Sequence, residues 1–442
     1  MENEDEYAIA LLRRLDDEPT NPSRVDLGRA IAEGGRRRRT RRALGGGGAV
    51  LLVAAMVATV PVALTALRPD SSGPDERAVA ATVPATTGPA ATEPAATRPT
   101  PGMAPTKCTV NRLPLPDREP MSLVTGADPT GRFIVGRTYP EERRDGYPIL
   151  MWDDGKPYRI VLPGADQSLT DVNTSGVAVG SGWLANGPQA YVYRDGRVSP
   201  LPGKGTSAAV AINDAGRIAG VRGEGAVDQR PIVWPDASAQ PVDLALPGPD
   251  WVGHVAGIDE DGTVVGVVWP NPSTVSADPG GSVTPKDRAR SARNPAAGYL
   301  WLPDGTRREL PKPVVRGVPA ESFRPLGIRN GWIIGTAVTY AADGTEVDTP
   351  ARYHLPTGEF VDLPPSTLRP RGGNGQGWMV GWLPNERLGL LTDAGTVDLP
   401  YVEPHRTAVG DAPVAVSDDG RIIAGQSEDA QNVIQAVVWN CR

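Results

Sequence analysis

Short runs of alternating apolar and polar residues, separated by turn residues, recur along the chain from about residue 108 to its end. The plainest copy is 209–220, in which two apolar segments flank the turn residues Asn213, Asp214 and Gly216 and the copy closes on Gly220. Closing glycines stand at 136, 180, 220, 266, 335, 381 and 425, so that successive copies are 40 to 46 residues apart except for one step of 69. A period in this range indicates a repeat architecture.

Each copy predicts two short strands joined by a tight turn. Asp or Asn opens the turn and Gly closes it three residues later, as in Asp128 with Gly131 and Asn213 with Gly216. This is the chemistry of a type I turn, because the side chain caps local N–H groups and Gly is free to adopt positive φ. The copies at 325–335 and 372–381 are degenerate, and in the first of these Asn330 and Gly331 shorten the turn.

The second half of each repeat predicts two more strands. An aromatic residue ends the third strand, a Gly turn follows, and a fourth strand ends in Leu-Pro, as in Trp152, Gly155, Leu162 and Pro163. Four period-2 strands in each unit are typical of one blade of a β-propeller, so the seven copies predict an all-β, seven-bladed propeller over 108–442. We expect the tryptophans at the equivalent third-strand position to belong to the blade-packing core; they are Trp152, Trp234, Trp301 and Trp439.

The two ends of this domain are predicted to share one blade. The last repeat stops after the strand that contains Trp439, and the missing Leu-Pro strand occurs at 108–116. Closure of the ring in this way removes exposed sheet edges. It also brings Cys108 and Cys441 onto neighbouring strands, so we expect a disulfide between them that constrains the unfolded chain by on the order of 5 kcal/mol.

Residues 1–67 predict a membrane anchor with a polar tail. The segment 43–67 contains no charged residue and is long enough to span a bilayer as a single helix, and six arginines lie between Arg36 and Arg42. The positive-inside rule then places the tail 1–42 in the cytoplasm and the propeller outside the cell. A cleaved signal peptide is the alternative, but it usually has a shorter apolar core. Within the tail, 1–35 is interpreted either as a docking peptide for a cytoplasmic partner or as a marginal juxtamembrane segment.

The segment 68–107 is rich in Pro, Thr and Ala and is predicted to be a disordered stalk between membrane and propeller. The order of motifs in the tail resembles the N-terminal tails of actinobacterial membrane proteins. Composition excludes other classes of function: the net charge is −7, and an acidic outer domain without a basic stripe argues against nucleic-acid binding. We expect a monomer.

The search for catalytic, cofactor and metal motifs yields no candidate. The chain has only three histidines and two cysteines, and it contains neither a nucleophile elbow nor a Walker loop. The acidic turns 259–262 and 417–420 resemble calcium loops, but these residues already fit turn positions and neither turn is followed by the required bidentate acid. We therefore expect no metal and no cofactor.

Strand direction indicates where a ligand would bind. The short Gly turns all lie on one face, whereas the longer connections, including 137–147 and 267–298, lie on the other, and long loops on a rigid scaffold often carry binding residues. An aromatic and basic platform on that loop face would bind a sugar, a peptide or a wall polymer. The alternative is that the rings pack between blades. The candidate residues are Tyr139, Trp183, Trp251, His254, Trp269, Arg324, Trp382, Tyr401 and His405.

The repeat of Ile-Asn-Asp-x-Gly-x-Ile-x-Gly, followed by an aromatic strand and a Leu-Pro strand, resembles the HAF-type extracellular repeat over 108–442. This resemblance implies a secreted or surface propeller and says little about activity. Two hypotheses follow. One is a membrane-tethered module that binds a ligand or protein outside the cell. The other is a propeller enzyme, a lyase or glycosidase acting on a polysaccharide or wall polymer. A glycosidase needs paired carboxylates, which spacing does not identify here, so we favour the binding module.

Overall fold

A computed structural model describes residues 103–116, 120–139, 148–223, 228–271, 296–341, 344–364, 368–404 and 410–442. The predicted cytoplasmic tail, membrane span and most of the stalk lie outside these residues. Within the described residues, no helix has the length and apolar composition needed to cross a membrane.

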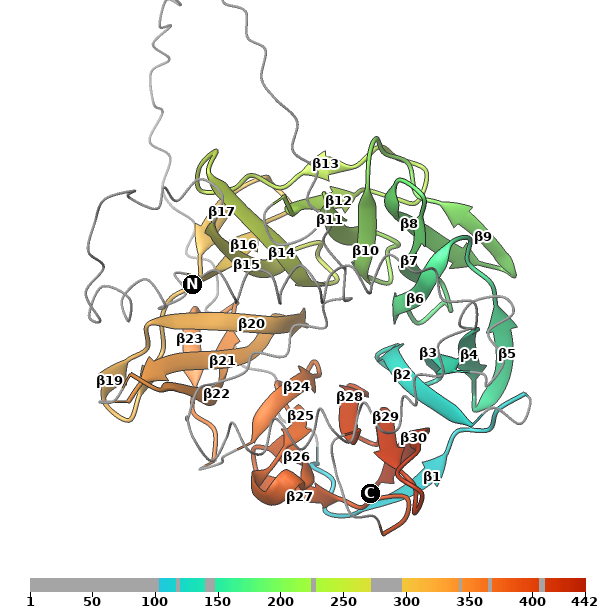
Figure 1. Cartoon of the computed structure of the whole chain (residues 1–442). Coiled ribbons are helices and arrows are strands. Elements are labelled where there is room, and N and C mark those ends of the chain that lie inside the picture. The colour runs from blue at the N-terminus through green and yellow to red at the C-terminus, as the bar shows by residue number, and fades with distance from the viewer. Residues whose placement is uncertain are drawn as a thin grey trace, which may run out of the picture. The chain divides into compact units, whose positions relative to one another are not determined.

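Seven antiparallel four-stranded sheets stand around a central channel and form the predicted seven-bladed propeller (Figure 1). The first strand of each blade lines the channel and the fourth lies at the rim. Blades one to three contain β2 (Met121–Ala127), β3 (Phe133–Tyr139), β4 (Ile149–Asp153) and β5 (Lys156–Ile160); β6 (Ala165–Val172), β7 (Ala178–Leu184), β8 (Gly187–Arg194) and β9 (Arg197–Pro200); and β10 (Ser207–Ile212), β11 (Ile218–Arg222), β12 (Arg230–Trp234) and β13 (Val242–Asp243).

Blades four to six follow the same order, and the seventh is composite. They contain β14 (Trp251–Ile258), β15 (Val264–Pro270), β16 (Ala297–Trp301) and β17 (Arg307–Glu309); β20 (Ser322–Arg329), β21 (Trp332–Tyr340), β22 (Glu346–His354) and β23 (Glu359–Val361); and β24 (Arg369–Gly373), β25 (Met379–Trp382), β26 (Leu388–Thr392) and β27 (Gly395–Leu399), with the 3-10 turn η1 (Pro384–Glu386) before β26. The seventh contains β28 (Ala412–Val416), β29 (Ile422–Glu428), β30 (Ile434–Cys441) and β1 (Cys108–Arg112).

The composite blade confirms the predicted ring closure. β1 pairs antiparallel with β30, and the register sets Cys108 opposite Cys441. The two sulfurs form a disulfide with a Cα–Cα distance of 4.0 Å. Residues of the predicted stalk adjoin this seam, because the N–H of Thr106 donates to the carbonyl of Arg442 and the N–H of Arg442 donates to that of Lys107.

The third-strand tryptophans bind each blade to its predecessor. Trp152, Trp234, Trp301 and Trp439 are at most 2% exposed, which confirms their predicted place in the core. The indole N–H of Trp234 donates to the carbonyl of Pro202 at 2.7 Å, and the other three donate to Pro114, Ala245 and Pro400. The accepting residue follows the outer strand of the preceding blade in each case. The outer strands therefore end earlier than predicted, since the Leu-Pro pair after β1, β5 and β9 follows the strand.

The closing glycine of each repeat is required by a close approach of three strands. Gly136 pairs with Val124, the residue before a bulge in β2, and the equivalent glycine in every other blade has the same place. A Cβ on Gly136 would overlap the carbonyl oxygen of Leu123. In the four blades with a third-strand tryptophan, this Cβ would also lie 2.8 to 3.1 Å from the indole ring. Only glycine allows the bulge and the tryptophan to coexist.

The 69-residue step has two sources. β15 and β16 are joined by a connection that contains the undescribed residues 272–295, and a small extra hairpin follows β17. This hairpin, β18 (Val314–Val315) and β19 (Val318–Pro319), leaves Val314 and Val318 more than half exposed. The sequence predicted a long connection at 267–298 but did not predict this hairpin.

Candidate functional site

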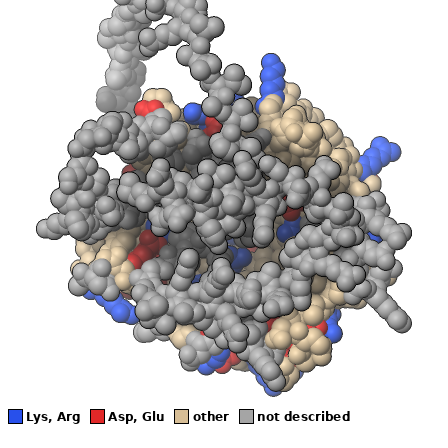
Figure 2. Space-filling view, in the orientation of Figure 1, with Lys and Arg blue, Asp and Glu red and all other residues tan. Residues whose placement is uncertain are grey.

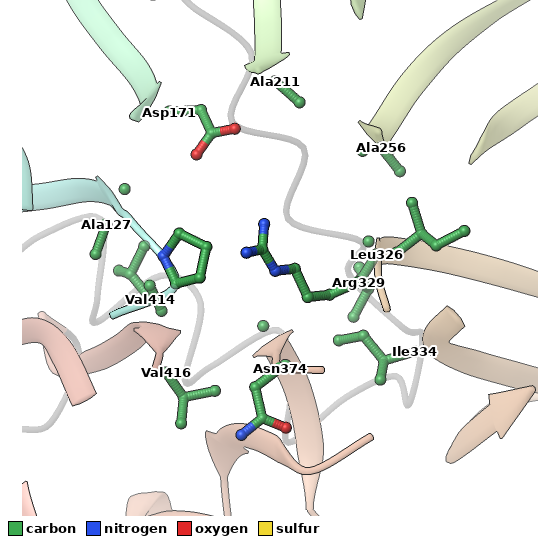
Figure 3. A pocket seen from close by; sticks show the side chains of 18 of the residues that line it. Ala127, Asp171, Ala211, Ala256, Leu326, Arg329, Ile334, Asn374, Val414 and Val416 are labelled. Atoms are coloured by element: carbon green, nitrogen blue, oxygen red, sulfur yellow. The ribbon is translucent and has the colours of Figure 1, made fainter. Parts of the chain in front are cut away.

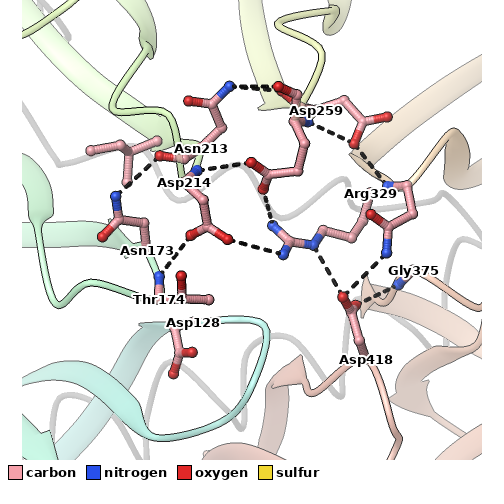
Figure 4. A network of polar contacts seen from close by, with 12 residues as sticks. Asp128, Asn173, Thr174, Asn213, Asp214, Asp259, Arg329, Gly375 and Asp418 are labelled. Atoms are coloured by element: carbon pink, nitrogen blue, oxygen red, sulfur yellow. Dashed lines mark hydrogen bonds and ion pairs between the residues drawn. The ribbon is translucent and has the colours of Figure 1, made fainter.

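Hydrogen bonds between the Asx turns connect neighbouring blades around one mouth of the channel, which we call the turn-side mouth. The amide of Asn173 donates to the carbonyl of Asn213, and that of Asn213 donates to the carbonyl of Asp259, at 3.1 and 3.0 Å (Figure 4). The amide of Asn374 donates to the carbonyl of Ser417 at 2.9 Å. The side-chain oxygen of each Asn accepts backbone N–H groups of its own turn. The repeated Asn is thus a structural residue that shapes one turn and binds the next.

Carboxylates at the second turn position reach back to the preceding blade. Asp214 accepts the N–H of Thr174, Glu260 accepts that of Asp214, and Asp418 accepts that of Gly375, at 2.8 to 2.9 Å. Among the described residues, no group of acidic, histidine or cysteine side chains has the geometry of a metal site.

Arg329 crosses the turn-side mouth and collects these carboxylates. It occupies the first turn position of the fifth blade, where the other blades have Asp, Asn or Ser. The turn there is one residue shorter than in blades two, three, four and six and two residues shorter than in blades one and seven. Its guanidinium lies 2.7 Å from Glu260, 3.4 Å from Asp418 and 4.0 Å from Asp214 (Figure 4). Burial raises the pKa of Glu260, and the positive charge of Arg329 opposes this shift. The carboxylates of the third, fourth and seventh blades are therefore bound through Arg329 to the fifth blade.

The channel beyond Arg329 holds a cavity of about 250 Å³ (Figure 3). Two rings of seven equivalent residues from the inner strands line it, since every inner strand is bulged at the same place. The bulge residues are Thr125, Thr170, Val210, Ala256, Leu326, Arg371 and Val414. The residues that follow them are Gly126, Asp171, Ala211, Gly257, Gly327, Gly372 and Ala415.

Asp171 and Arg371 are the two charges in these otherwise small or uncharged rings. The carboxylate of Asp171 accepts the N–H groups of Ile212 and Val172 at 2.8 and 2.9 Å and points into the cavity (Figure 3). Part of its side chain is accessible through the channel, but burial by the surrounding blades raises its pKa to about 7.

Arg371 comes from the sixth blade and stacks on Trp382. Its guanidinium carbon lies 5.1 Å from the centre of the Trp382 ring, and burial lowers its pKa. Arg369, two residues earlier and exposed, lies 5.6 Å from the same ring. The indole N–H of Trp382 donates to the carbonyl of Asp411 at 2.7 Å, which fixes the ring.

The predicted loop-face residues are spread over several blades. Tyr139, Trp183, Trp269 and Trp382 lie at or near the ends of the second strands of blades one, two, four and six. The eight candidates within the described residues are all partly buried, and none of them lines the 250 Å³ cavity. His405 lies outside the described residues.

Some of these candidates already have structural partners. Arg324 pairs with Glu346 at 2.7 Å, the Tyr401 hydroxyl donates to the carbonyl of Glu386, and Trp251 packs on the core around Trp301. The rings of His254 and Trp269 lie 5.4 Å apart, and burial lowers the pKa of His254.

Asp171, Arg329 and Arg371 were not predicted from the sequence. Asp171 and Arg371 depart from their columns when the seven copies are aligned on their closing glycines, so a column-by-column comparison of the repeats would have shown them. The shorter turn of the fifth repeat shifts Arg329 out of the column of first turn residues in such an alignment.

A second cavity of about 740 Å³ lies at the rim between the fifth and sixth blades. Its walls are mostly apolar and include Val315, Pro350, Phe360 and Leu363. On the face shown in Figure 2, basic side chains are visible around the periphery and also near the centre, in gaps between the grey residues.

No family model matches the chain, and no curated protein matches its sequence. Solved propellers resemble its fold at low identity. The β-propeller domain of the Trilobed protease from Pyrococcus furiosus is 11% identical, with a TM-score of 0.47 over 72% of this chain and 95% of that one. TolB from Acinetobacter baumannii is 10% identical, with a TM-score of 0.37 over 70% and 80%. YCF48 bound to D1 peptide is 12% identical, with a TM-score of 0.39 over 77% and 97%.

Proposed function

We propose that this protein is a membrane-tethered propeller that binds a ligand or a partner protein outside the cell. The proposed binding site is the loop-side mouth of the channel, which lies opposite the turn-side mouth. The observation that carries the proposal is the difference between the two mouths. Arg329 and three carboxylates cross the turn-side mouth, whereas the strand ends on the other side carry partly buried aromatic side chains, among them Trp183 and Trp269. Aromatic side chains on rigid strands are good binding anchors.

Binding explains the observed chemistry better than catalysis does. The carboxylates that the structure gathers, Asp214, Glu260 and Asp418, are bound to Arg329 and to backbone N–H groups. A glycosidase would need a second free carboxyl group beside Asp171, but the other carboxylates that line the cavity, Asp128 and Asp418, are bound to turn N–H groups and to Arg329. The resemblance to the HAF-type extracellular repeat also supports a surface module.

The proposed location rests on the arginine-rich segment before 43–67 and is supported by the disulfide, which suits an oxidising compartment. Protease added to intact cells should release a fragment close in size to 108–442. A full-length protein that survives this treatment, and is cut only after the cells are opened, would reverse the topology.

Ligand binding is tested with the purified full-length protein in detergent micelles on glycan and peptide arrays. Trp183→Ala and Trp269→Ala should each weaken binding of the ligand identified by about 1–3 kcal/mol if the rings are stacking anchors. Val242→Ala, in the exposed outer strand of the third blade, is the control and should leave binding unchanged. If both tryptophan variants lose several kcal/mol of stability but bind as before, these rings are core and the binding site lies elsewhere.

A further inference from the structure

Arg371 is the one basic residue among the seven bulge residues that line the channel. It occupies the bulge position of β24, so its side chain leaves the paired part of the strand and lines the cavity. The next two residues are Gly372 and Gly373, which carry no side chain to cover the guanidinium. Gly372 is required there, because a Cβ would overlap the carbonyl oxygen of Val414 on the neighbouring inner strand.

Trp382 supports one face of the guanidinium and leaves its edge available. The ring is held by its bond to the carbonyl of Asp411, and the carboxylate of Asp411 accepts the N–H of Glu428 at 2.8 Å. A stacked guanidinium gains cation–π energy through its face, but its five N–H donors point outward from the edge in a planar fork.

Those donors have no acidic partner within the part of the chain that the structure describes. Arg329, the other arginine in the cavity lining, differs because it has its three carboxylates. Outside the lining, Arg324 pairs with Glu346 and Arg137 pairs with Asp166. A partly buried cation without a counter-ion is costly, and a guanidinium matches an oxyanion through two parallel hydrogen bonds. The 250 Å³ cavity has room for such a group and several atoms attached to it.

We propose that the channel is an anion-binding site, in which Arg371, supported by Trp382, binds the carboxylate, sulfate or phosphate group of a ligand. The proposal rests on the ligand-binding function above and adds the chemical class of the group recognised. Asp171, on the second blade, is the negative charge in the same two rings of inner-strand residues, so its removal should strengthen anion binding.

The test uses the purified full-length protein and three probes, sodium sulfate, sodium phosphate and sodium acetate, each exchanged against chloride at constant ionic strength. An anion that binds the native state raises the unfolding temperature in a saturable way, whereas general salting-out stabilisation by sulfate does not saturate. We expect a saturable rise in the wild type and in the control Arg369→Gln, and its loss in Arg371→Gln. The anion that saturates at the lowest concentration identifies the favoured group.

Two further variants test the same site if Arg371→Gln does not fold. Arg371→Lys keeps the charge but not the planar fork and should weaken the affinity for the anion about tenfold. Asp171→Asn should increase this affinity. A saturable rise that persists unchanged in Arg371→Gln or Arg371→Lys, or that no probe produces in the wild type, overturns the proposal.

The two proposals fail separately. An array ligand that binds Arg371→Gln as tightly as the wild type would remove the anion site and leave the binding module intact. Saturable anion binding in the absence of any array ligand would support the anion site and leave the binding module without support.

Discussion

Arg329 shows how one substitution in a repeat changes the electrostatics of a whole face. In six blades the first turn residue hydrogen-bonds its own turn, but in the fifth the arginine reaches across the channel instead. Asp259 then compensates for the missing Asx, because its carboxylate accepts the N–H groups of Asn330 and Gly331. A single basic side chain thus neutralises carboxylates from three blades.

Replacing Arg329 with Met should therefore destabilise the propeller by about 1–3 kcal/mol at neutral pH, because Glu260, Asp214 and Asp418 lose their shared counter-ion. The loss should shrink as the pH falls and the carboxylates take up protons. Urea unfolding at several pH values measures it. Arg222→Met, which breaks an exposed pair with Asp243, is the matched control and should cost no more than about 1 kcal/mol. Equal effects of the two variants would contradict a special role for Arg329.

Asp171 should make stability pH-dependent in the opposite direction to an ordinary paired acid. Burial raises the pKa of its carboxyl to about 7, so the folded state holds a proton that the unfolded state releases near pH 4. The contribution of Asp171 to stability is complete at low pH and is lost as the pH rises from about 4 to about 7. Arg329 lowers this pKa and Glu260 raises it.

Asp171→Asn removes this titration. The stability of the variant relative to the wild type should therefore increase by about 1–3 kcal/mol between pH 4 and pH 8. Urea unfolding at both pH values measures the difference. A constant difference across this range would show that the carboxyl titrates as an ordinary, unburied acid.

At the scale of the strand and the blade, the sequence predicted the features that depend on residues recurring at the same position of each repeat. The closing glycine meets the bulge of the inner strand in all seven blades, and in four of them a third-strand tryptophan packs on it and donates to the chain after the preceding outer strand. The same residues therefore recur, and the number of blades follows from the glycines. The hairpin of β18 and β19 was not predicted, because two strands of two residues leave no periodicity to detect.

The candidate site was less predictable for a related reason. Aromatic residues near predicted loops are visible in one sequence, and the structure finds them partly buried at strand ends. Asp171 and Arg371 lie inside regular strands, where a charge is usually interpreted as surface. Their importance comes from the channel, which exists only after seven inner strands are set side by side.

The tryptophan contact between blades predicts a specific loss on mutation. Trp234→Phe keeps most of the buried ring but removes the N–H that satisfies the carbonyl of Pro202. A partly buried carbonyl left without a donor should cost about 1–3 kcal/mol in unfolding free energy. Trp183→Phe, at a partly buried strand end, should cost less than about 1 kcal/mol. If both changes cost the same, the hydrogen bond does not stabilise the blade contact.

At the scale of the whole molecule, stability depends on the seam at which the two ends meet. β1 is the only strand of the seventh blade that comes from the N-terminal side, and its five paired residues close the ring. Separation of β1 from β30 would expose two sheet edges and the Pro114 carbonyl that Trp152 requires. Opening the seam therefore also weakens the first blade.

The disulfide between Cys108 and Cys441 holds this seam across 333 residues of sequence. The chain-entropy model predicts that a disulfide closing such a loop stabilises the folded protein by on the order of 5 kcal/mol. The measured loss on reduction should be smaller if the strands remain paired after the bond is broken. Replacing both cysteines with Ser should therefore lower the unfolding free energy by about 2–5 kcal/mol, and a reducing agent should do the same to the wild type and nothing to the double variant. Denaturant unfolding with and without reductant measures both effects. If reduction leaves the wild-type transition unchanged, β1 holds by hydrogen bonds and packing alone. The bond would then be incidental to the stability of the ring, although peptide mapping under non-reducing conditions should still find the two cysteines joined.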